Sequence, residues 1–400
     1  MIRGVTNQRW MRAITITIGL LTIAAVTLLK QYYPKAFEWA ELKASDLRIY
    51  RGALPKPTGN VVIAAIDDKS IAELGRFPWP RSVEARLVTA LRDYNAAVVG
   101  FDIAFTERDP ADSAQQELAH RLEEAGIGER IVRDALSGSN DLVFAHAMQQ
   151  SSTYLGYFFR SHMFHEATGA ELVSFRAKSI KPPPAAYNMT FKGPGAQQQT
   201  YIADGYLPPI QLLNGAAHGT AYVDIDEDSD GTTRSEPAVI RFDGRYCVPL
   251  FLAMADAYFG QPPLILRFDA DGVSGVEIGT RKIPVNEHGD MIVHFRGQPG
   301  VIPQVSFADI VAHRAPAAKL AHKVVLVGVT AHAIGDRIVA PVSGDFPGVE
   351  FQATAIDNVL AGDFVYSSLY LTAMERVSAW LMGAGAALAA AFMTALSSAL

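Results

Sequence analysis

The sequence predicts an α/β fold, a largely parallel sheet with covering helices and an added antiparallel hairpin. Segments 61–67, 96–102 and 323–329 are continuous apolar runs of strand length, which is typical of strands buried on both faces of a parallel sheet. Segments with a helical period of apolar residues separate these runs, as in other α/β proteins. An Asp-Gly pair between two further strands indicates the hairpin.

The elements of the first half alternate between strand and helix. After the first strand, apolar residues recur at helical spacing over 81–94, and Pro80 suits the start of that helix. The polar stretch 112–133 predicts one or two exposed helices. A helix over 140–150 and a strand over 153–160 follow.

Residues 161–209 lose this periodicity. They contain a proline triplet at 182–184, a glutamine triplet at 197–199 and a proline pair at 208–209. We therefore interpret the segment as an irregular insertion.

The remaining elements are shorter. Strands over 219–226 and 234–242 form the predicted hairpin around Asp230-Gly231. Ser306 begins a short helix, with Asp309 in the acidic position of a capping box. The other predicted elements are a helix over 248–259, strands near 264–268, 276–278 and 291–295, and a last helix over 348–360.

Two uncharged segments predict transmembrane helices that flank this domain. Residues 13–29 are just long enough to span the hydrocarbon core, and Trp10, Tyr32 and Tyr33 stand at interfacial positions. Residues 377–400 form the second segment. The alternatives are a cleaved signal peptide at the first segment and a buried Ala-rich helix at the second.

The charges around the first segment set the expected orientation. Arg3, Arg9 and Arg12 precede the membrane helix, so residues 1–12 are expected in the cytoplasm. Residues 30–376 then form an extracytoplasmic domain on the periplasmic side of a bacterial inner membrane. Because the chain stops within apolar sequence, we expect it to be the front part of a longer polypeptide.

Composition excludes several classes of function. Hydrophobic residues make up 49% and charged residues 19%, a balance typical of globular proteins. With 35 Lys and Arg against 41 Asp and Glu, the net charge of −6 leaves no basic excess for phosphates, so no nucleic-acid partner is expected. The single Cys247 cannot form an internal disulfide or a thiolate metal site.

Several motifs, in a fixed order, resemble those of the type-2 CHASE domain. They are VVIAAIDDKSIAELG followed by RFPWPRS, AAVVGFDIAF, LPPIQLLNGAAHGTAYVDIDEDSDGTTRSEP, VSFADIV, KVVLVGVTAHAIGDR and APVSGDFPGVEFQATAIDNVL. Together they cover roughly residues 40–365. The combination of IDDKS, PWPR, GFDI, DSDG and PGVEFQA in this order is more specific than any one motif.

The resemblance implies a sensor outside the cell that relays a stimulus through membrane spans to a cytoplasmic output domain. In such receptors the output is a class III adenylate or guanylate cyclase, a histidine or Ser/Thr kinase, or a diguanylate cyclase. A class III cyclase beyond residue 400 is the output we expect, although only one of the usual later spans is present. The alternative is a membrane-tethered interaction module without an output enzyme.

Carboxylates follow the predicted parallel strands, where ligands collect in open α/β sheets. The candidate ligand or cation site consists of Asp67, Asp68, Arg81, Asp102, Thr330 and Asp336. The structural alternative is that Asp67 or Asp68 caps the next helix and that Asp102 binds loop amides. An enzyme acting through Asp67, Asp68 and Asp102 is a third possibility, but a phosphatase with an acidic nucleophile would need aspartates two positions apart.

An aspartate series begins like a calcium loop. Asp226, Asp228 and Asp230 precede Gly231 with the required spacing. At later ligand positions stand Arg234 and Pro237, so a hairpin turn is the favoured interpretation. No zinc, phosphate-loop or nucleophile motif occurs in residues 30–376, and we predict no catalytic residue, metal or cofactor. The expected partners are the lipid bilayer, an unidentified small-molecule or envelope ligand, and a second copy of the chain.

Overall fold

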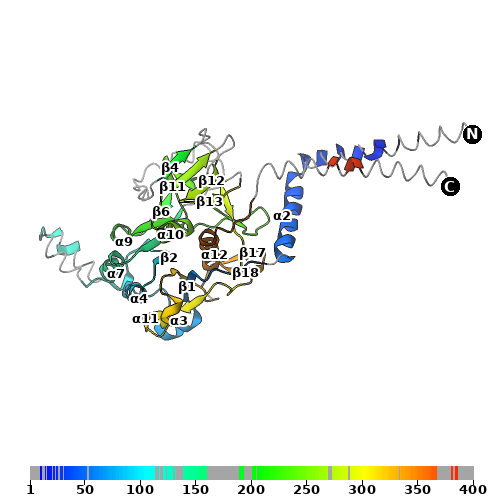
Figure 1. Cartoon of the computed structure of the whole chain (residues 1–400). Helices are drawn as coiled ribbons and strands as arrows, with labels where there is room; N and C mark the ends of the chain where they lie inside the picture. Colours follow the sequence, from blue (N-terminus) through cyan, green and yellow to red (C-terminus); the bar gives the residue numbers. More distant parts are fainter. Residues whose placement is uncertain are drawn as a thin grey trace, which may run out of the picture. The chain divides into compact units, whose positions relative to one another are not determined.

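A computed structural model divides the chain into two units, residues 1–51 with 367–400 and residues 52–366 (Figure 1). The described residues are 31–51, 54–112, 139–159, 189–192, 201–203, 205–268, 273–286, 289–332 and 334–366, with scattered positions within 10–29, 117–138 and 380–385.

The first unit contains helix α2 (Pro34–Arg51), whose side chains Trp39 and Leu47 are exposed. No helix in the described part of the chain is both long and apolar enough to cross a membrane. The predicted span at 377–400 falls mostly, and the span at 13–29 partly, on residues outside that part, so both stay predictions.

The second unit is built on a seven-stranded sheet. Its order is β15-β1-β16-β2-β3-β6, with β7 also beside β3, and every neighbouring pair is parallel except β3 with β6. The strands are β1 (Val61–Ile66), β2 (Val98–Ala104), β3 (Thr153–Phe159), β6 (Tyr206–Leu207), β7 (Gly219–Tyr222), β15 (Gln304–Ser306) and β16 (Val324–Val329). The prediction of a largely parallel sheet is confirmed.

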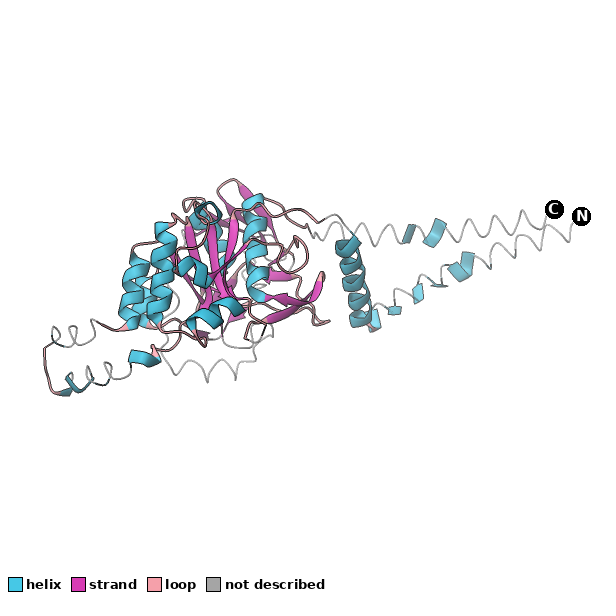
Figure 2. Cartoon of the chain, turned by 90° about the horizontal axis from the view of Figure 1, so that it is seen from below, coloured by secondary structure: helices cyan, strands magenta, loops and turns pink. Residues whose placement is uncertain are grey.

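Helices cover both faces of this sheet (Figure 2). One layer consists of α3 (Asp68–Leu74), α4 (Arg81–Asp93), α7 (Asn140–Gln149), α9 (Gln211–Ala216) and α11 (Phe307–Val311). The other consists of α10 (Leu250–Tyr258) and α12 (Gly348–Ala361). The helices predicted over 81–94, 140–150, 248–259 and 348–360 are therefore confirmed to within two residues.

The buried core alternates between the two layers along each strand. Val62, Ala64 and Ile66 of β1 pack in one cluster with Leu87 and Leu91 of α4, since successive strand residues point to opposite faces. On the opposite face, α12 lies very close to β16. A Cβ atom at Gly328 would come within 2.5 Å of Val349 Cγ2, so glycine is what permits this approach.

Smaller sheets complete the second unit. They are β13-β12-β11-β4, β10-β9-β5, β14-β8 and β17-β18. Their strands are β4 (Met189–Lys192), β5 (Ile202–Ala203), β8 (Ser235–Pro237), β9 (Ile240–Phe242), β10 (Arg245–Cys247), β11 (Leu264–Phe268), β12 (Val273–Ile278), β13 (Arg281–Pro284), β14 (Asp290–Ile292), β17 (Arg337–Ala340) and β18 (Ser343–Pro347).

The predicted hairpin around Asp230-Gly231 is wrong. β7, before that turn, pairs in parallel with β3, and β8, after it, pairs with β14. The second Asp-Gly pair, Asp243-Gly244, joins β9 and β10 in an antiparallel hairpin, and both of its residues have positive φ, 47° and 74°. Two positive φ values are what a type I′ hairpin turn requires.

The interpretation of 161–209 as an irregular insertion is wrong where the structure describes it. β4 pairs with β11, β5 with β9, and β6 with β3. Three short strands of this segment therefore join three different sheets. The rest of the segment, and most of the exposed helices predicted over 112–133, lie outside the described residues.

Candidate functional site

The ends of strands β1 and β15 are joined by Asp67, which is the N-cap of α3. Its Oδ1 accepts hydrogen bonds from Ser70 N at 2.8 Å and from Ser306 Oγ at 2.9 Å. The Ser70 hydroxyl in turn accepts from Ala308 N at 3.1 Å, at the start of α11. Asp67 therefore has the capping role of the structural alternative, whereas Asp68 is exposed in the first turn of α3.

The capping box predicted at Ser306 is wrong, because the Ser306 hydroxyl is directed to Asp67 rather than to its own helix. Asp309, the expected acidic partner, accepts from Lys69 Nζ at 2.7 Å and from Arg314 Nε at 2.8 Å. These contacts hold α3 and α11 together at the surface.

Arg81 lies apart from the other predicted site residues. Its backbone N–H donates to Asp109 Oδ2 at 2.6 Å, and its Nε lies 3.9 Å from Asp141 Oδ1. The guanidinium stacks 4.5 Å from the centre of the Phe105 ring. Arg81 thus connects the start of α4 to the segment after β2 and to α7.

Asp102 and Asp336 come together near the beginning of α12. Asp102 lies inside β2, where the pairing with β3 shifts register between Phe101 and Ala104, so the strand continues past the predicted end. Burial, and secondarily the charge of Asp336, raise the pKa of Asp102 to about 7. The Asp336 carbonyl accepts from Gly348 N at 3.0 Å, which places this residue at the N-terminus of α12.

Thr330 follows β16 and contacts the end of β1 through its backbone. Its N–H donates to Ile66 O at 3.1 Å, and its carbonyl accepts from Arg337 Nη2 at 3.3 Å. Thr330 is therefore bonded to the residue before Asp67 and to the residue after Asp336, whereas Asp102 lies near Asp336. Binding of a ligand by any of the six stays a prediction.

Two acids outside the predicted ligand site, Glu236 and the half-buried Asp224, extend this group. Glu236 of β8 is fully buried, and its Oε1 accepts from Gln352 Nε2 of α12 at 2.7 Å. Glu236 Oε2 and Gln352 Oε1 have no hydrogen-bond partner among the described residues. Asp224 accepts from Phe159 N at 2.9 Å. The one sequence signal for Glu236 is its position directly before the apolar run that enters β9.

Burial controls the protonation of these acids. It raises the pKa of Asp224 to about 7 and that of Glu236 well above its ordinary value, to which the charges of Asp102 and Asp224 add. A neutral carboxyl group can donate as well as accept a hydrogen bond. We therefore define Asp102, Asp224 and Glu236 as the carboxyl cluster, in which Asp102 and Asp224 can bind or release protons near neutral pH. Among the described residues, no group of three or more His, Cys, Asp or Glu is arranged to hold a metal ion.

The aspartate series after β7 surrounds an arginine of the same chain. Arg234 Nη1 donates to Asp228 Oδ2 at 2.6 Å and to Asp230 Oδ1 at 2.9 Å, and Nη2 donates to Asp230 Oδ2 at 2.9 Å. The guanidinium is almost fully buried. It supplies positive charge to two of the carboxylates that a calcium loop would use.

A buried ion pair joins the first and last parts of the second unit. Arg296 Nε donates to Asp357 Oδ2 of α12 at 2.8 Å, and both side chains are inaccessible to solvent. Asp357 Oδ1 also accepts from the backbone and hydroxyl of Thr58, ahead of β1. Arg296 Nη1 donates to Asp363, which follows α12 and also contacts His294. We call these residues the Arg296 clamp.

Comparison with protein-family models identifies the family of the chain. The CHASE2 domain model matches residues 18–395. The chain belongs to the CHASE2 domain family. No curated protein and no solved structure matches it. CHASE2 domains are extracellular sensory domains of signalling receptors, so the sensor function expected from the motifs is confirmed for the family.

Proposed function

We propose that this chain is the extracytoplasmic sensor of a bacterial transmembrane receptor and that it relays a stimulus to a cytoplasmic class III adenylate or guanylate cyclase. The observation that supports the sensor part of the proposal is the CHASE2 match over nearly the whole chain, and the cyclase output is what the resemblance of the motifs implies. The proposed location is the inner membrane, with residues 1–12 in the cytoplasm, spans at 13–29 and 377–400, and residues 30–376 in the periplasm.

The Arg296 clamp provides a route for the signal. A ligand changes a receptor only if it binds two conformations with different affinity. Thr58 and Asp363 bond to the same buried ion pair, so a rearrangement of α12 acts on both ends of the sensor together. In a homodimer, such a change would favour one arrangement of the membrane spans.

Cysteine labelling tests the membrane topology. Cys247 is the only cysteine and is buried, so Cys247→Ser gives a background for single introduced cysteines. A membrane-impermeant maleimide applied to intact spheroplasts should label Gln149→Cys, on the exposed surface of α7, and should not label Thr6→Cys until the cells are lysed. Labelling of Thr6→Cys in intact cells would contradict the orientation.

Product analysis tests the output. The gene's complete reading frame should raise cyclic AMP or cyclic GMP in a host that lacks its own cyclases. Phosphoryl transfer from ATP without a cyclic nucleotide would indicate a kinase receptor instead. The absence of both activities would favour the interaction module without an output enzyme.

A further inference from the structure

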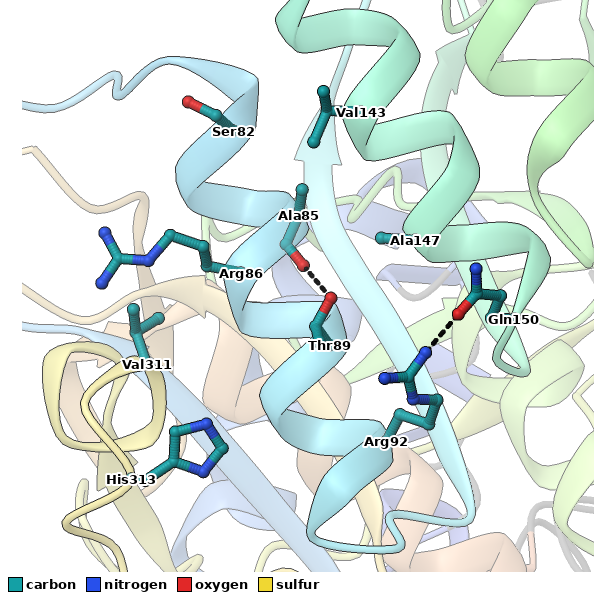
Figure 3. A pocket seen from close by; sticks show the side chains of 10 residues that line it. All are labelled: Ser82, Ala85, Arg86, Thr89, Arg92, Val143, Ala147, Gln150, Val311 and His313. Carbon is teal, nitrogen blue, oxygen red and sulfur yellow. Dashed lines mark hydrogen bonds between the residues drawn. The ribbon is translucent and has the colours of Figure 1, made fainter.

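A groove of about 400 Å³ follows the outer face of α4, between α7 and α11 (Figure 3). Its floor consists of Ser82, Ala85 and Thr89, which recur at spacings of three and four and therefore share one face of the helix. Ala147 of α7 leaves further room. Short side chains on both helices thus create the hollow, and its volume lies within the range of small-molecule sites.

The groove combines apolar walls with positive charge. Val143 and Val311 form apolar parts of its two sides, while Arg86 and Arg92 supply guanidinium groups. None of the residues that line the groove carries a carboxylate, although the whole chain has a net charge of −6. A ligand with a negative group is therefore favoured over a neutral or cationic one of the same shape.

The two arginines differ in what they contact. Arg92 donates to Gln150 Oε1 and, at 3.2 Å, to the neighbouring Asp93. Arg86 is exposed, and no hydrogen bond or ion pair joins it to another described residue. Arg86 extends from α4 on the side of Val311 and His313 (Figure 3), and the His313 ring packs against Tyr94, with their centroids 5.5 Å apart.

We propose that this groove binds a small organic carboxylate, with the carboxylate on Arg86 and the apolar portion against Ala147 and Val143. The planar guanidinium presents paired N–H donors that match a carboxylate. The inference deepens the proposed sensor function by giving its ligand a chemical class, and its signalling meaning rests on that function. Binding itself can be measured without any output enzyme.

Calorimetric titration of the full chain in detergent micelles tests the proposal, with 3-phenylpropionate and hexanoate as probes. Both acids should bind with one saturable site per chain. The neutral analogue 3-phenylpropan-1-ol should bind at least about tenfold more weakly, because it lacks the charge-assisted hydrogen bonds. Inorganic phosphate should bind more weakly than either acid, since it lacks the apolar portion.

Three variants locate the site. Arg86→Gln should weaken binding of both acids about tenfold, and Ala147→Phe should abolish it by filling the groove. Arg76→Gln is the matched control, because Arg76 is exposed and does not line the groove. Unchanged affinity in Arg86→Gln, equal binding of the alcohol, or no saturable binding of the acids by the wild-type chain would overturn the proposal.

The titration, together with a measurement of cyclic nucleotide production, separates the proposal of a carboxylate-binding groove from the proposal of a cyclase receptor. Binding that depends on Arg86, without any effect of the acids on cyclic nucleotide production, would leave the groove in place and contradict its role in a cyclase receptor. Cyclic nucleotide production by a chain that binds none of the acids would support the receptor and overturn the groove.

Discussion

Asp102, Asp224 and Glu236 show how single residues gain unusual properties from their surroundings. Each is a carboxyl group whose pKa is raised mainly by burial, because an apolar environment disfavours the charged form. Asp102 and Asp336 could be expected from their positions after predicted strands. Glu236 and Gln352 could not, because their burial depends on how α12 packs against β8, which no local pattern reveals.

Asp102 should make the stability of the protein depend on pH. Its pKa is 3.8 in its ordinary state and about 7 in the fold, so between these values the unfolded chain loses a proton that the folded chain keeps. The free energy of unfolding therefore falls as pH rises from about 4 to about 7, and stays low above that. Asp102→Asn should match the wild type near pH 4 and exceed it by about 1–3 kcal/mol at pH 8.

Urea denaturation of the full chain in detergent, followed by near-ultraviolet circular dichroism, measures this difference. The exposed Asp68→Asn is the control and should show no comparable rise between pH 4 and pH 8. An Asp102→Asn protein with the same pH slope as the wild type would show that Asp102 ionises normally.

The buried ion pair between Arg296 and Asp357 gives a second prediction for single residues. Arg296→Met leaves the Asp357 carboxylate buried without its cation, which should cost about 3–5 kcal/mol of stability. Arg296→Met combined with Asp357→Leu should be less destabilising than the sum of the two single changes, because no uncompensated charge remains. Additive effects in the denaturation experiment would show that the pair is not coupled.

Among the elements, α12 contains an unusual number of buried polar residues. Glu350, Gln352, Asp357 and Asn358 are all fully buried in it. Glu350 accepts from Gly300 N at 2.8 Å, and Asn358 Oδ1 accepts from His294 N at 2.8 Å. Glu350 and Asn358 thus bond to backbone groups of the chain between β14 and β15, so α12 organises loops as well as covering the sheet.

The close packing of α12 on β16 makes Gly328 sensitive to substitution. Gly328→Ala would place its Cβ 2.5 Å from Val349 Cγ2 and 2.8 Å from Val349 Cβ, so the helix must move. We expect a loss of about 1–3 kcal/mol, as for other overpacked cores. Gly215→Ala in α9 is the control, because nothing lies within 4 Å of its added Cβ, and it should stabilise the protein by about 0.5–1 kcal/mol.

Element type was predictable here, whereas strand pairing was not. β1, β16, α4 and α12 were found within two residues because their apolar patterns are long and local. The Asp-Gly signal at residues 230–231 failed because β7 pairs with β3, which is more than 60 residues earlier in the chain. The residues of a turn do not show whether the strand before it pairs with a strand so distant in the sequence.

At the scale of the whole molecule, the family match places the chain among sensory domains of signalling receptors. The motifs in their fixed order carried that information, since composition and periodicity alone gave only an α/β class. The predicted candidate site divided into three places: the cap at Asp67, the Arg81 contacts and the edge at Asp102. Residues that follow parallel strands lie at the same edge of a sheet. Their positions in the sequence do not show which of their side chains cap or contact neighbouring helices instead of facing a ligand.

The Arg296 clamp brings the two ends of the second unit close together. Thr58 and Asp363 are separated by some 300 residues of sequence yet bond to the same buried pair. A domain whose two ends leave from one place can be inserted into a surface loop of a host without forcing the host's halves apart. This domain is therefore suited to insertion between the two parts of a light-emitting reporter protein. Ligand binding to the domain would then change the light that the reporter emits.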